Sequence, residues 1–320
     1  MTTIGRHVSN LSGYAPAVPT PFGPDDAIDG AAFERFCARQ VAKGATALVV
    51  CGTTGEAPTL TSAEHREVIR IAAAVARGQV PVIAGAGSNA TAHAVELSRD
   101  AEAAGADAIL SVAPYYNKPT QAGIEAHFRA IAGATRLPLF LYDVPSRTIS
   151  GLADDTVARL AELPQIIGLK DATGDITRPA RLRPRLGSDF RLLSGDDATA
   201  PAYLAQGGDG CISVTSNVAP SLCRMLYLQR RNSHAIHVQW LVQLHARLTA
   251  ALFRESNPAP VKYALSLLGL MSARLRLPLV EPTQATRADV RAAMAAIDDG
   301  YSDYLIESAD ALTARVHAAQ

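Results

Sequence analysis

A lysine at the end of a short apolar segment is the residue of this sequence with the clearest capacity for chemistry. Lys170 closes the run Ile-Ile-Gly-Leu-Lys over residues 166–170. If this run is a buried strand, the side chain of Lys170 lies at the end of that strand and is partly shielded from water. Such burial disfavours the charged form of an amine. A neutral amine can attack a ketone and form a Schiff base. The alternative is a solvated lysine that pairs with Asp171.

Two further residues could move protons around such an amine. Tyr142 ends the apolar run over residues 138–142 and could transfer a proton to and from a carbinolamine. Thr53, which follows another apolar run, could relay that proton toward solvent or substrate. Taken singly, each of the two is better explained by capping or packing.

Two features suit the binding of carboxylates. The glycines of the run Gly-Thr-Thr-Gly at residues 52–55 let backbone N–H groups approach a small anion. Arg147, on the loop that follows Tyr142, offers a planar fork for a second carboxylate. A surface arginine held by Asp143 or another acid is the alternative. Together, these features suggest a small carboxylate bound beside the amine.

The elements that must position these residues alternate along the chain. Short apolar runs indicate strands, and the longer amphipathic runs between them indicate helices, one of which opens with a capping box at Thr61 and Glu64. The predicted strands span residues 15–19, 45–51, 80–84, 107–112, 138–142, 166–170, 190–194 and 210–214. Eight strands that are each followed by a helix predict an α/β fold, a (β/α)8 TIM barrel, with a doubly wound sheet as the second choice. In a barrel the carboxyl ends of the strands share one face, so the polar residues named above should meet there.

The last third of the chain has a different pattern. After Val214 the strand signals stop, and residues 219–320 are almost entirely helical in pattern, with breaks at prolines such as Pro258 and Pro278. This predicts a C-terminal helical appendage. We therefore divide the chain into a catalytic (β/α)8 barrel over residues 1–231 and a C-terminal helical region over residues 232–320.

Composition disfavours several classes of function. The 30 basic and 30 acidic residues cancel, so no basic field is available to attract nucleic acid or a membrane surface. No stretch is long and apolar enough for a transmembrane helix, and no apolar segment follows Arg6 as in a secretory signal, so we expect a cytoplasmic protein. The four cysteines form no C-x-x-C pair and look like packed, reduced thiols. No metal site is expected, because His234 and His237 have no acidic residue beside them.

Two other patterns admit more than one interpretation. The segment Gly-Ala-Gly-Ser-Asn-Ala at residues 85–90, followed by Asp107, formally matches a dinucleotide-binding fingerprint. Its position after the third strand of a longer series disfavours that function. Asp196 and Asp197 resemble a metal-ligating pair, but a helix N-cap after Gly195 is the favoured interpretation.

At these residues the chain resembles the dihydrodipicolinate synthase family of pyruvate-dependent class I lyases. The resemblance covers nearly everything from Gly13 to about Met294. It is carried by the motifs GTTGEAPTL at 52–60, PYYNKPTQ at 114–121, YDVPSRT at 142–148, GLKDATGD at 168–175, LLSGDDAT at 192–199, GCISVTSN at 210–217 and NPAPVK at 257–262. These motifs occur on separate loops in one order, so their combination is specific.

The resemblance implies a catalytic set. Lys170 would form the Schiff base with pyruvate, and Tyr142 would donate and accept protons. Thr53 and Tyr116 would complete a proton relay, with Tyr116 supplied by the neighbouring subunit of a tight dimer. The reaction would condense pyruvate with L-aspartate 4-semialdehyde in the diaminopimelate route to lysine.

The resemblance also implies a substrate-binding set and partners. Thr54 and Ile212 match positions that contact bound pyruvate, and Arg147 matches the arginine that receives the carboxylate of aspartate semialdehyde. No diffusible cofactor is implied beyond the covalent pyruvate Schiff base. Family members are usually homotetramers built as dimers of dimers, which gives the helical appendage a possible role in assembly.

The sequence departs from the family at two informative positions. Asp143 stands where many members have asparagine, which could alter the charge around Arg147. The chain matches part of the family's lysine-binding site at His65, Asn89 and Tyr115, but His93 replaces a glutamate of that site. An imidazole supplies less attraction for an amino group than a carboxylate, so we expect weak feedback inhibition by lysine.

Two alternative functions remain open from the sequence. Another pyruvate-linked aldolase, such as a sialic acid or keto-sugar acid lyase, would retain Lys170 and Tyr142 but would need an acceptor pocket that binds hydroxyl groups. A catalytically silent barrel oligomer would show loss of the lysine, the tyrosine or the relay. None of these is lost here, and Arg147 and Thr53 favour the lysine-pathway condensation.

Overall fold

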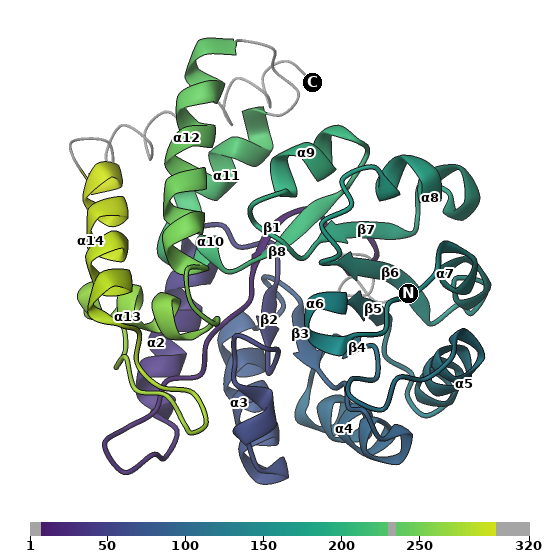
Figure 1. Cartoon of the computed structure of the whole chain (residues 1–320). Coiled ribbons are helices and arrows are strands. Elements are labelled where there is room, and N and C mark those ends of the chain that lie inside the picture. Colours follow the sequence, from purple (N-terminus) through teal and green to yellow (C-terminus); the bar gives the residue numbers. More distant parts are fainter. Residues whose placement is uncertain (1–7, 230–234, 299–320) are drawn as a thin grey trace.

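Eight parallel strands surround the centre of the molecule (Figure 1). The structure, a computed structural model, describes residues 8–229 and 235–298. The strands are β1 (Gly13–Pro16), β2 (Leu48–Val50), β3 (Val82–Gly85), β4 (Ala108–Val112), β5 (Leu139–Asp143), β6 (Ile166–Asp171), β7 (Arg191–Ser194) and β8 (Gly210–Ser213). They pair in the order β1-β8-β7-β6-β5-β4-β3-β2, and a parallel bridge between Ala17 and Val49 joins the two ends. The fold is the predicted (β/α)8 barrel, and each predicted strand lies within a few residues of an observed one.

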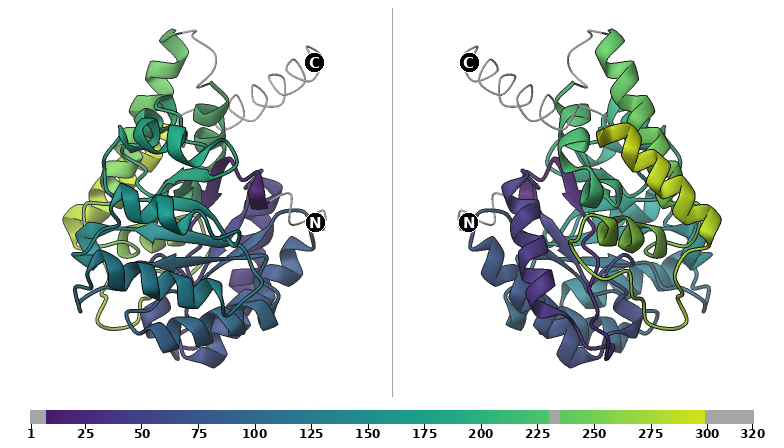
Figure 2. Two further views of the ribbon diagram at one scale, coloured as in Figure 1. Left: turned by 90° about the vertical axis from the view of Figure 1, so that its right-hand side faces the viewer. Right: turned by 90° about the vertical axis from the view of Figure 1, so that its left-hand side faces the viewer.

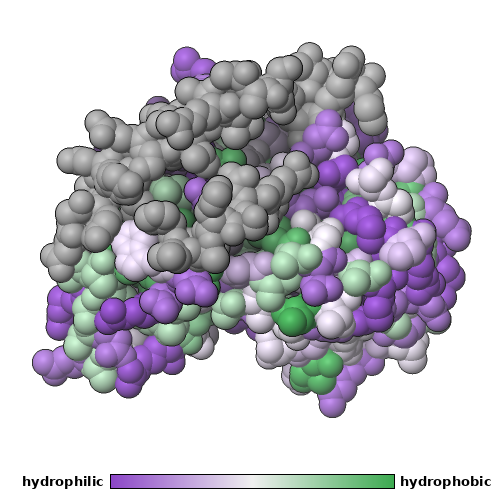
Figure 3. Space-filling view, turned by 90° about the horizontal axis from the view of Figure 1, so that it is seen from above, coloured by the Kyte–Doolittle hydropathy of each residue, from purple (hydrophilic) through white to green (hydrophobic). Residues whose placement is uncertain are grey.

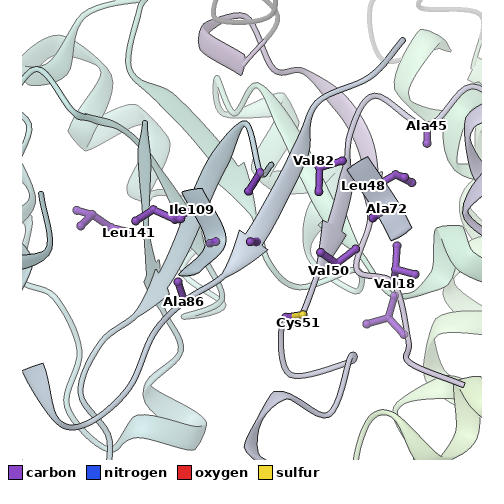
Figure 4. Close-up of a cluster of buried hydrophobic side chains, with 14 of the residues drawn as sticks. Val18, Ala45, Leu48, Val50, Cys51, Ala72, Val82, Ala86, Ile109 and Leu141 are labelled. Carbon is purple, nitrogen blue, oxygen red and sulfur yellow. The ribbon is translucent and has the colours of Figure 1, made fainter. Parts of the chain in front are cut away.

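Alternation of side chains along each strand separates two hydrophobic layers. On β5, Phe140 and Tyr142 belong to the core inside the barrel, whereas Leu139 and Leu141 belong to the layer between strands and helices. Figure 4 shows part of that outer layer, including Leu141. Because successive side chains of a strand point to opposite faces, the pattern of β5 fixes Tyr142 toward the interior.

Helices cover the outside of the barrel (Figure 1). They are α2 (Gly30–Ala42), α3 (Ser62–Ala76), α4 (Thr91–Ala104), α5 (Gln121–Ala132), α7 (Asp154–Leu160), α8 (Arg178–Leu186) and α9 (Ala200–Ala205), with short turns η1 (Ala57–Thr59) and α6 (Pro145–Thr148) on the loops. The predicted capping box is confirmed, since the Thr61 side chain accepts from the Glu64 N–H and the Glu64 carboxylate accepts from the Thr61 N–H.

The C-terminal helices pack against one side of the barrel. They are α10 (Thr215–Val218), α11 (Pro220–Gln229), α12 (Ala235–Leu252), α13 (Ala259–Leu267) and α14 (Gln284–Asp298), and α12 and α14 lie side by side in Figures 1 and 2. Leu248, Val261 and Val290 share one hydrophobic core with the barrel strands. The predicted domain boundary between residues 231 and 232 lies outside the described residues. The same holds for His234 and for residues 299–320.

The glycines of the segment 85–90 serve the packing of strands. A Cβ atom at Gly85 would lie 2.0 Å from the carbonyl oxygen of Cys51, and one at Gly87 would lie 2.4 Å from the Val112 nitrogen. These contacts between neighbouring strands explain why glycine is required at both positions. Dinucleotide binding is therefore not needed to account for the fingerprint.

The N-cap role predicted for the pair Asp196 and Asp197 is wrong. The N-cap of α9 is Thr199, without a side-chain cap. Asp197 is buried and instead accepts hydrogen bonds from the Val214 and Thr215 N–H groups at 2.7 and 3.1 Å, at the start of α10. The aspartate thus satisfies a helix N-terminus that lies near it in space but follows the next strand of the chain.

No helix among residues 8–229 and 235–298 has both the length and the apolar character needed to cross a membrane. Within the described part of the face shown in Figure 3, hydrophobic residues form only small patches between hydrophilic ones. The described residues also contain no group of three or more histidine, cysteine, aspartate or glutamate side chains that could hold a metal ion. The cytoplasmic location stays a prediction.

Candidate active site

Strands β5 and β6 place Tyr142 and Lys170 side by side. The two residues are paired in the parallel register of these strands, and both point into the barrel. The Lys170 Nζ atom lies 4.1 Å from the centroid of the Tyr142 ring, and each residue is only 7% exposed. The ring therefore covers the amine, and the strand next to that of Lys170 carries the phenolic hydroxyl of Tyr142.

A glycine on the neighbouring strand end makes room for the lysine. Gly195 follows β7, and a Cβ atom there would lie 2.9 Å from Lys170 Cε and 3.0 Å from Cγ. Contacts below 3.0 Å between carbon atoms are repulsive, so only glycine leaves the extended lysine side chain in its present place. This role of Gly195 is not apparent from the sequence.

Lys170 has no ion-pair partner within the described part of the chain. Asp171, the partner considered from the sequence, instead accepts hydrogen bonds from the Thr173 N–H and hydroxyl groups at 3.0 and 2.7 Å. Its other carboxylate oxygen lies 3.5 Å from Arg178 Nη1. Pairing of Lys170 with Asp171 is therefore wrong, and the amine is held by packing rather than by a carboxylate.

A cavity of about 310 Å³ opens above Lys170 at the carboxyl ends of the strands. It brings together six of the seven residues selected from the sequence: Thr53, Thr54, Tyr142, Arg147, Lys170 and Ile212. These residues come from the loops or ends of β2, β5, β6 and β8. The volume suits a small organic acid and a second small substrate.

One residue of the C-terminal region completes the wall of this cavity. The Asn257 side-chain Nδ2 donates to the Thr54 hydroxyl at 2.9 Å, and the Asn257 carbonyl oxygen accepts from Arg147 Nη2 at 3.4 Å. Sequence analysis gave Asn257 no individual role. The sequence does contain a signal for a loop at this position, because a proline-rich break at residues 257–260 interrupts the helical pattern.

Further residues that line the cavity also escaped assignment. They are Val144, Ser146, Ala172, Thr173, Gly174, Gly195, Asp196, Val214 and Phe253. Asp196 is the only carboxylate among the residues that line this cavity. Its oxygens accept from the Ala198 N–H at 3.2 Å and from the Thr199 hydroxyl at 2.7 Å. The cavity wall thus combines two basic side chains, Arg147 and Lys170, and one acidic side chain, Asp196, with several hydroxyl groups.

Asp143 does not hold Arg147. Its Oδ2 atom accepts from Arg178 Nη1 at 2.7 Å and from the Leu152 N–H at 3.2 Å, on the side of β5 away from the cavity. Burial raises the pKa of the Asp143 carboxyl above its usual range, and the Arg178 guanidinium opposes that shift. The replacement of asparagine by aspartate therefore changes the charge around Arg178, and Arg147 remains available to a ligand.

Tyr116 is the one selected residue that stays outside the cavity. Its side chain is 83% exposed, and its backbone has the left-handed φ of 75°. Left-handed backbone at a residue other than glycine is costly and is concentrated at functional loops. The Asn117 side-chain Nδ2 donates to the Asn89 carbonyl oxygen at 2.9 Å and anchors this loop.

A second cavity, of about 420 Å³, adjoins the first and shares Thr53, Tyr142, Val144 and Arg147 with it. Its other side is lined by the side chains of His65, Ser88, His93 and Tyr115, among others. His65 Nε2 lies 2.7 Å from the Gly85 carbonyl oxygen. Burial lowers the pKa of His65 below its usual range, although this contact opposes the shift.

Comparison with known proteins identifies relatives over most of the chain. Residues 10–297 match the model of the dihydrodipicolinate synthetase family. A 4-hydroxy-tetrahydrodipicolinate synthase of Rhodospirillum centenum is 52% identical over 278 residues, which is 87% of this chain and 95% of the relative.

Solved structures agree with this result. A dihydrodipicolinate synthase of Acinetobacter baumannii complexed with pyruvate is 42% identical, with a TM-score of 0.85 over 89% of this chain and 98% of that one. A dihydrodipicolinate synthase of Cyanidioschyzon merolae with lysine bound is 38% identical, with a TM-score of 0.86 over 89% of this chain and 97% of that one. The chain belongs to the dihydrodipicolinate synthetase family.

Proposed function

We propose that the chain is a Schiff-base lyase that condenses pyruvate with L-aspartate 4-semialdehyde to 4-hydroxy-tetrahydrodipicolinate, in the diaminopimelate route to lysine. The observation that carries the proposal is the position of Lys170, an amine without an ion-pair partner among the described residues, beside Tyr142 in a cavity that also presents Arg147. The names of the relatives, at about half identity over most of the chain, support it.

The chemistry follows from the order of groups in the cavity. The neutral Lys170 amine attacks the keto carbon of pyruvate, and loss of water from the carbinolamine gives the imine. Tyr142 exchanges the protons of these steps, with Thr53 next to it as relay. Removal of a methyl proton gives an enamine, whose carbon attacks the aldehyde of the second substrate. Thr54 and Ile212 contact the pyruvate part, and Arg147 receives the carboxylate of the semialdehyde.

A steady-state assay of pyruvate with a panel of aldehydes tests the choice of acceptor. We expect aspartate semialdehyde to give the highest kcat/KM, because Arg147 matches its carboxylate. A sialic acid or keto-sugar acid lyase would prefer sugar aldehydes or would cleave the corresponding keto acids. Higher kcat/KM with such compounds would refute the proposed acceptor while leaving the Schiff base intact.

We further propose that Tyr116 acts in the site of a neighbouring subunit of a homotetramer. Its exposure and left-handed backbone support a role outside its own cavity. Tyr116→Phe and Lys170→Ala variants, each nearly inactive, should regain part of the activity when refolded together, since a mixed dimer contains one intact composite site. If mixed dimers form, as shown by mass spectrometry, and no activity returns, the relay lies within one chain.

A further inference from the structure

The turn that carries Thr53 and Thr54 is fastened by a fully buried ion pair to a helix more than 200 residues away. Lys262, on α13, donates from Nζ to Glu56 Oε1 at 2.7 Å and to the Thr20 carbonyl oxygen at 2.8 Å. Lys262 is 0% exposed and Glu56 is 1% exposed. The ion pair lies outside the residues that line the catalytic cavity, so substrate binding does not explain it.

Glu56 ends the turn in an unusual backbone conformation. Its φ is 55°, and its N–H donates to the Thr53 carbonyl oxygen at 3.1 Å. Left-handed backbone at a residue other than glycine is strained and persists only where surrounding contacts impose it. The contacts here are Lys262 on Oε1 and the Arg276 N–H on Oε2 at 3.1 Å. The ion pair thus supplies a reason for the shape of the turn.

Several further contacts surround the ion pair. The ring of Phe22 lies 4.3 Å from both Lys262 Nζ and the Arg276 guanidinium carbon. The Thr20 hydroxyl donates to the Gly55 carbonyl oxygen at 2.8 Å. Burial lowers the pKa of Lys262 below its usual range, and Glu56 opposes that shift. The Lys262 ammonium on α13 therefore contacts both the segment after β1 and the turn after β2.

A second contact from the same part of the chain reaches the turn. Asn257, five residues before Lys262, donates to the Thr54 hydroxyl at 2.9 Å. The C-terminal region thus holds both halves of the turn, one at Thr54 and one at Glu56. A buried ion pair is weak evidence for stability, because desolvation offsets much of the Coulomb attraction. Positional control of the turn is a better explanation for this one.

We propose that Glu56 and Lys262 are positioning residues that hold the Thr53 hydroxyl where it can exchange protons with Tyr142. The inference deepens the proposed function and rests on it for the role of Thr53. Loss of the pair should slow proton transfer to and from bound pyruvate without preventing the Schiff base on Lys170, because the polar contacts of the pair go to Thr20 and Arg276 and not to β6.

The test uses four variants of the whole chain. Glu56→Gln and Lys262→Met each leave one buried group without its charged partner, so both should lower Tm. The double variant Glu56→Gln/Lys262→Met removes both charges and should recover most of that loss. Val290→Ala is the matched control, because Val290 is a fully buried core residue on α14 that does not line the catalytic cavity.

The readout is deuterium exchange at the methyl group of pyruvate in D₂O, measured by NMR, since exchange needs proton transfer but no second substrate. We expect roughly 10- to 100-fold slower exchange in the double variant, as for a misplacement of about 1 Å in a catalytic group. Borohydride trapping of pyruvate on Lys170 should still go to completion. Val290→Ala should lower Tm and leave exchange unchanged.

Two results would overturn the proposal. One is exchange within threefold of the unmodified chain in the double variant. The other is the same loss of exchange in Val290→Ala at equal Tm. Because exchange does not involve the aldehyde, an enzyme that exchanges normally but does not use aspartate semialdehyde would refute only the acceptor. Absence of exchange in the unmodified chain would refute the Schiff-base function itself.

Discussion

Two of the four lysines of the chain are buried, and their surroundings differ in the one respect that decides their chemistry. Lys262 lies at the joint between the turn after β2 and α13, where Glu56 pairs with it at 2.7 Å. Lys170 lies at the mouth of the barrel, faces the Tyr142 ring and has no carboxylate partner in the part of the chain that the structure describes. A lysine held by a carboxylate is occupied by that contact, whereas an amine without such a partner is available to a ligand.

Access differs between the two lysines as well. The cavity of about 310 Å³ reaches Lys170 and presents Arg147 to a ligand, whereas Lys262 is not among the residues that line it. Burial of a lysine is therefore not sufficient to identify a nucleophile. The partner and the open volume beside the amine must be considered together.

The largest effect is expected from removal of the proposed nucleophile, Lys170. Lys170→Ala should lower kcat at least about 1,000-fold, because the covalent path is lost entirely. Its folding should be little affected, since no ion pair breaks. Lys262→Met should show the opposite balance, with a large loss of Tm and a smaller loss of rate. Steady-state kinetics and thermal unfolding of both variants measure these changes in kcat and Tm. Equal losses of kcat in the two variants would contradict the different roles assigned to the two lysines.

Arg147 lines the same cavity as Lys170, and its proposed role concerns the second substrate. Arg147→Ala should remove a charge-assisted hydrogen bond of about 1.5–3 kcal/mol and reduce kcat/KM for aspartate semialdehyde roughly 10- to 200-fold. Trapping of pyruvate on Lys170 should be unchanged. If the variant used the semialdehyde normally, the acceptor would be a different aldehyde.

The space beside Lys170 offers a subtler change. Gly195→Ala should push Cε of the lysine from its place and slow pyruvate trapping roughly 10- to 100-fold. Gly123→Ala on α5 is the matched control, because the added Cβ would meet its nearest neighbour at an ordinary 3.4 Å. Rapid-quench trapping compares the two variants. Equal trapping rates would show that the lysine tolerates displacement.

The smallest effect concerns regulation at the second cavity. His93 lines this cavity beside His65 and Tyr115, and the family's lysine-sensitive pattern has a glutamate in its place. The loss of a charge-assisted contact of about 1.5–3 kcal/mol should weaken the binding of free L-lysine at least about tenfold. We therefore predict weak inhibition at neutral pH and greater sensitivity in His93→Glu. Strong inhibition of the unmodified chain by submillimolar lysine would contradict this.

The fold could be predicted because its signals are local. Each strand is a short apolar run, and the parallel topology brings the carboxyl ends of the strands together. The proximity of Tyr142 and Lys170 could therefore be predicted from the sequence. The motif resemblance added residue roles that spacing alone could not assign.

Contacts between distant segments could not be predicted in the same way. Thr54 and Asn257 are 203 residues apart, and Glu56 and Lys262 are 206 residues apart, so no periodicity connects them. The partners considered for Asp143 and Asp171 were neighbours along the chain or the loop, whereas both carboxylates turn to Arg178 on α8. The ion-pair partner of a charged side chain depends on which groups lie near it in the folded structure. Proximity along the sequence therefore predicted the wrong partner for both carboxylates.

The central claim is tested most directly by trapping of pyruvate with borohydride, followed by peptide mapping. The account predicts one adduct, on Lys170, at a stoichiometry near one per chain, and no label on Lys262, Lys118 or Lys43. Omission of pyruvate should abolish the label. An adduct on Lys262, or no adduct on any lysine, would contradict the account.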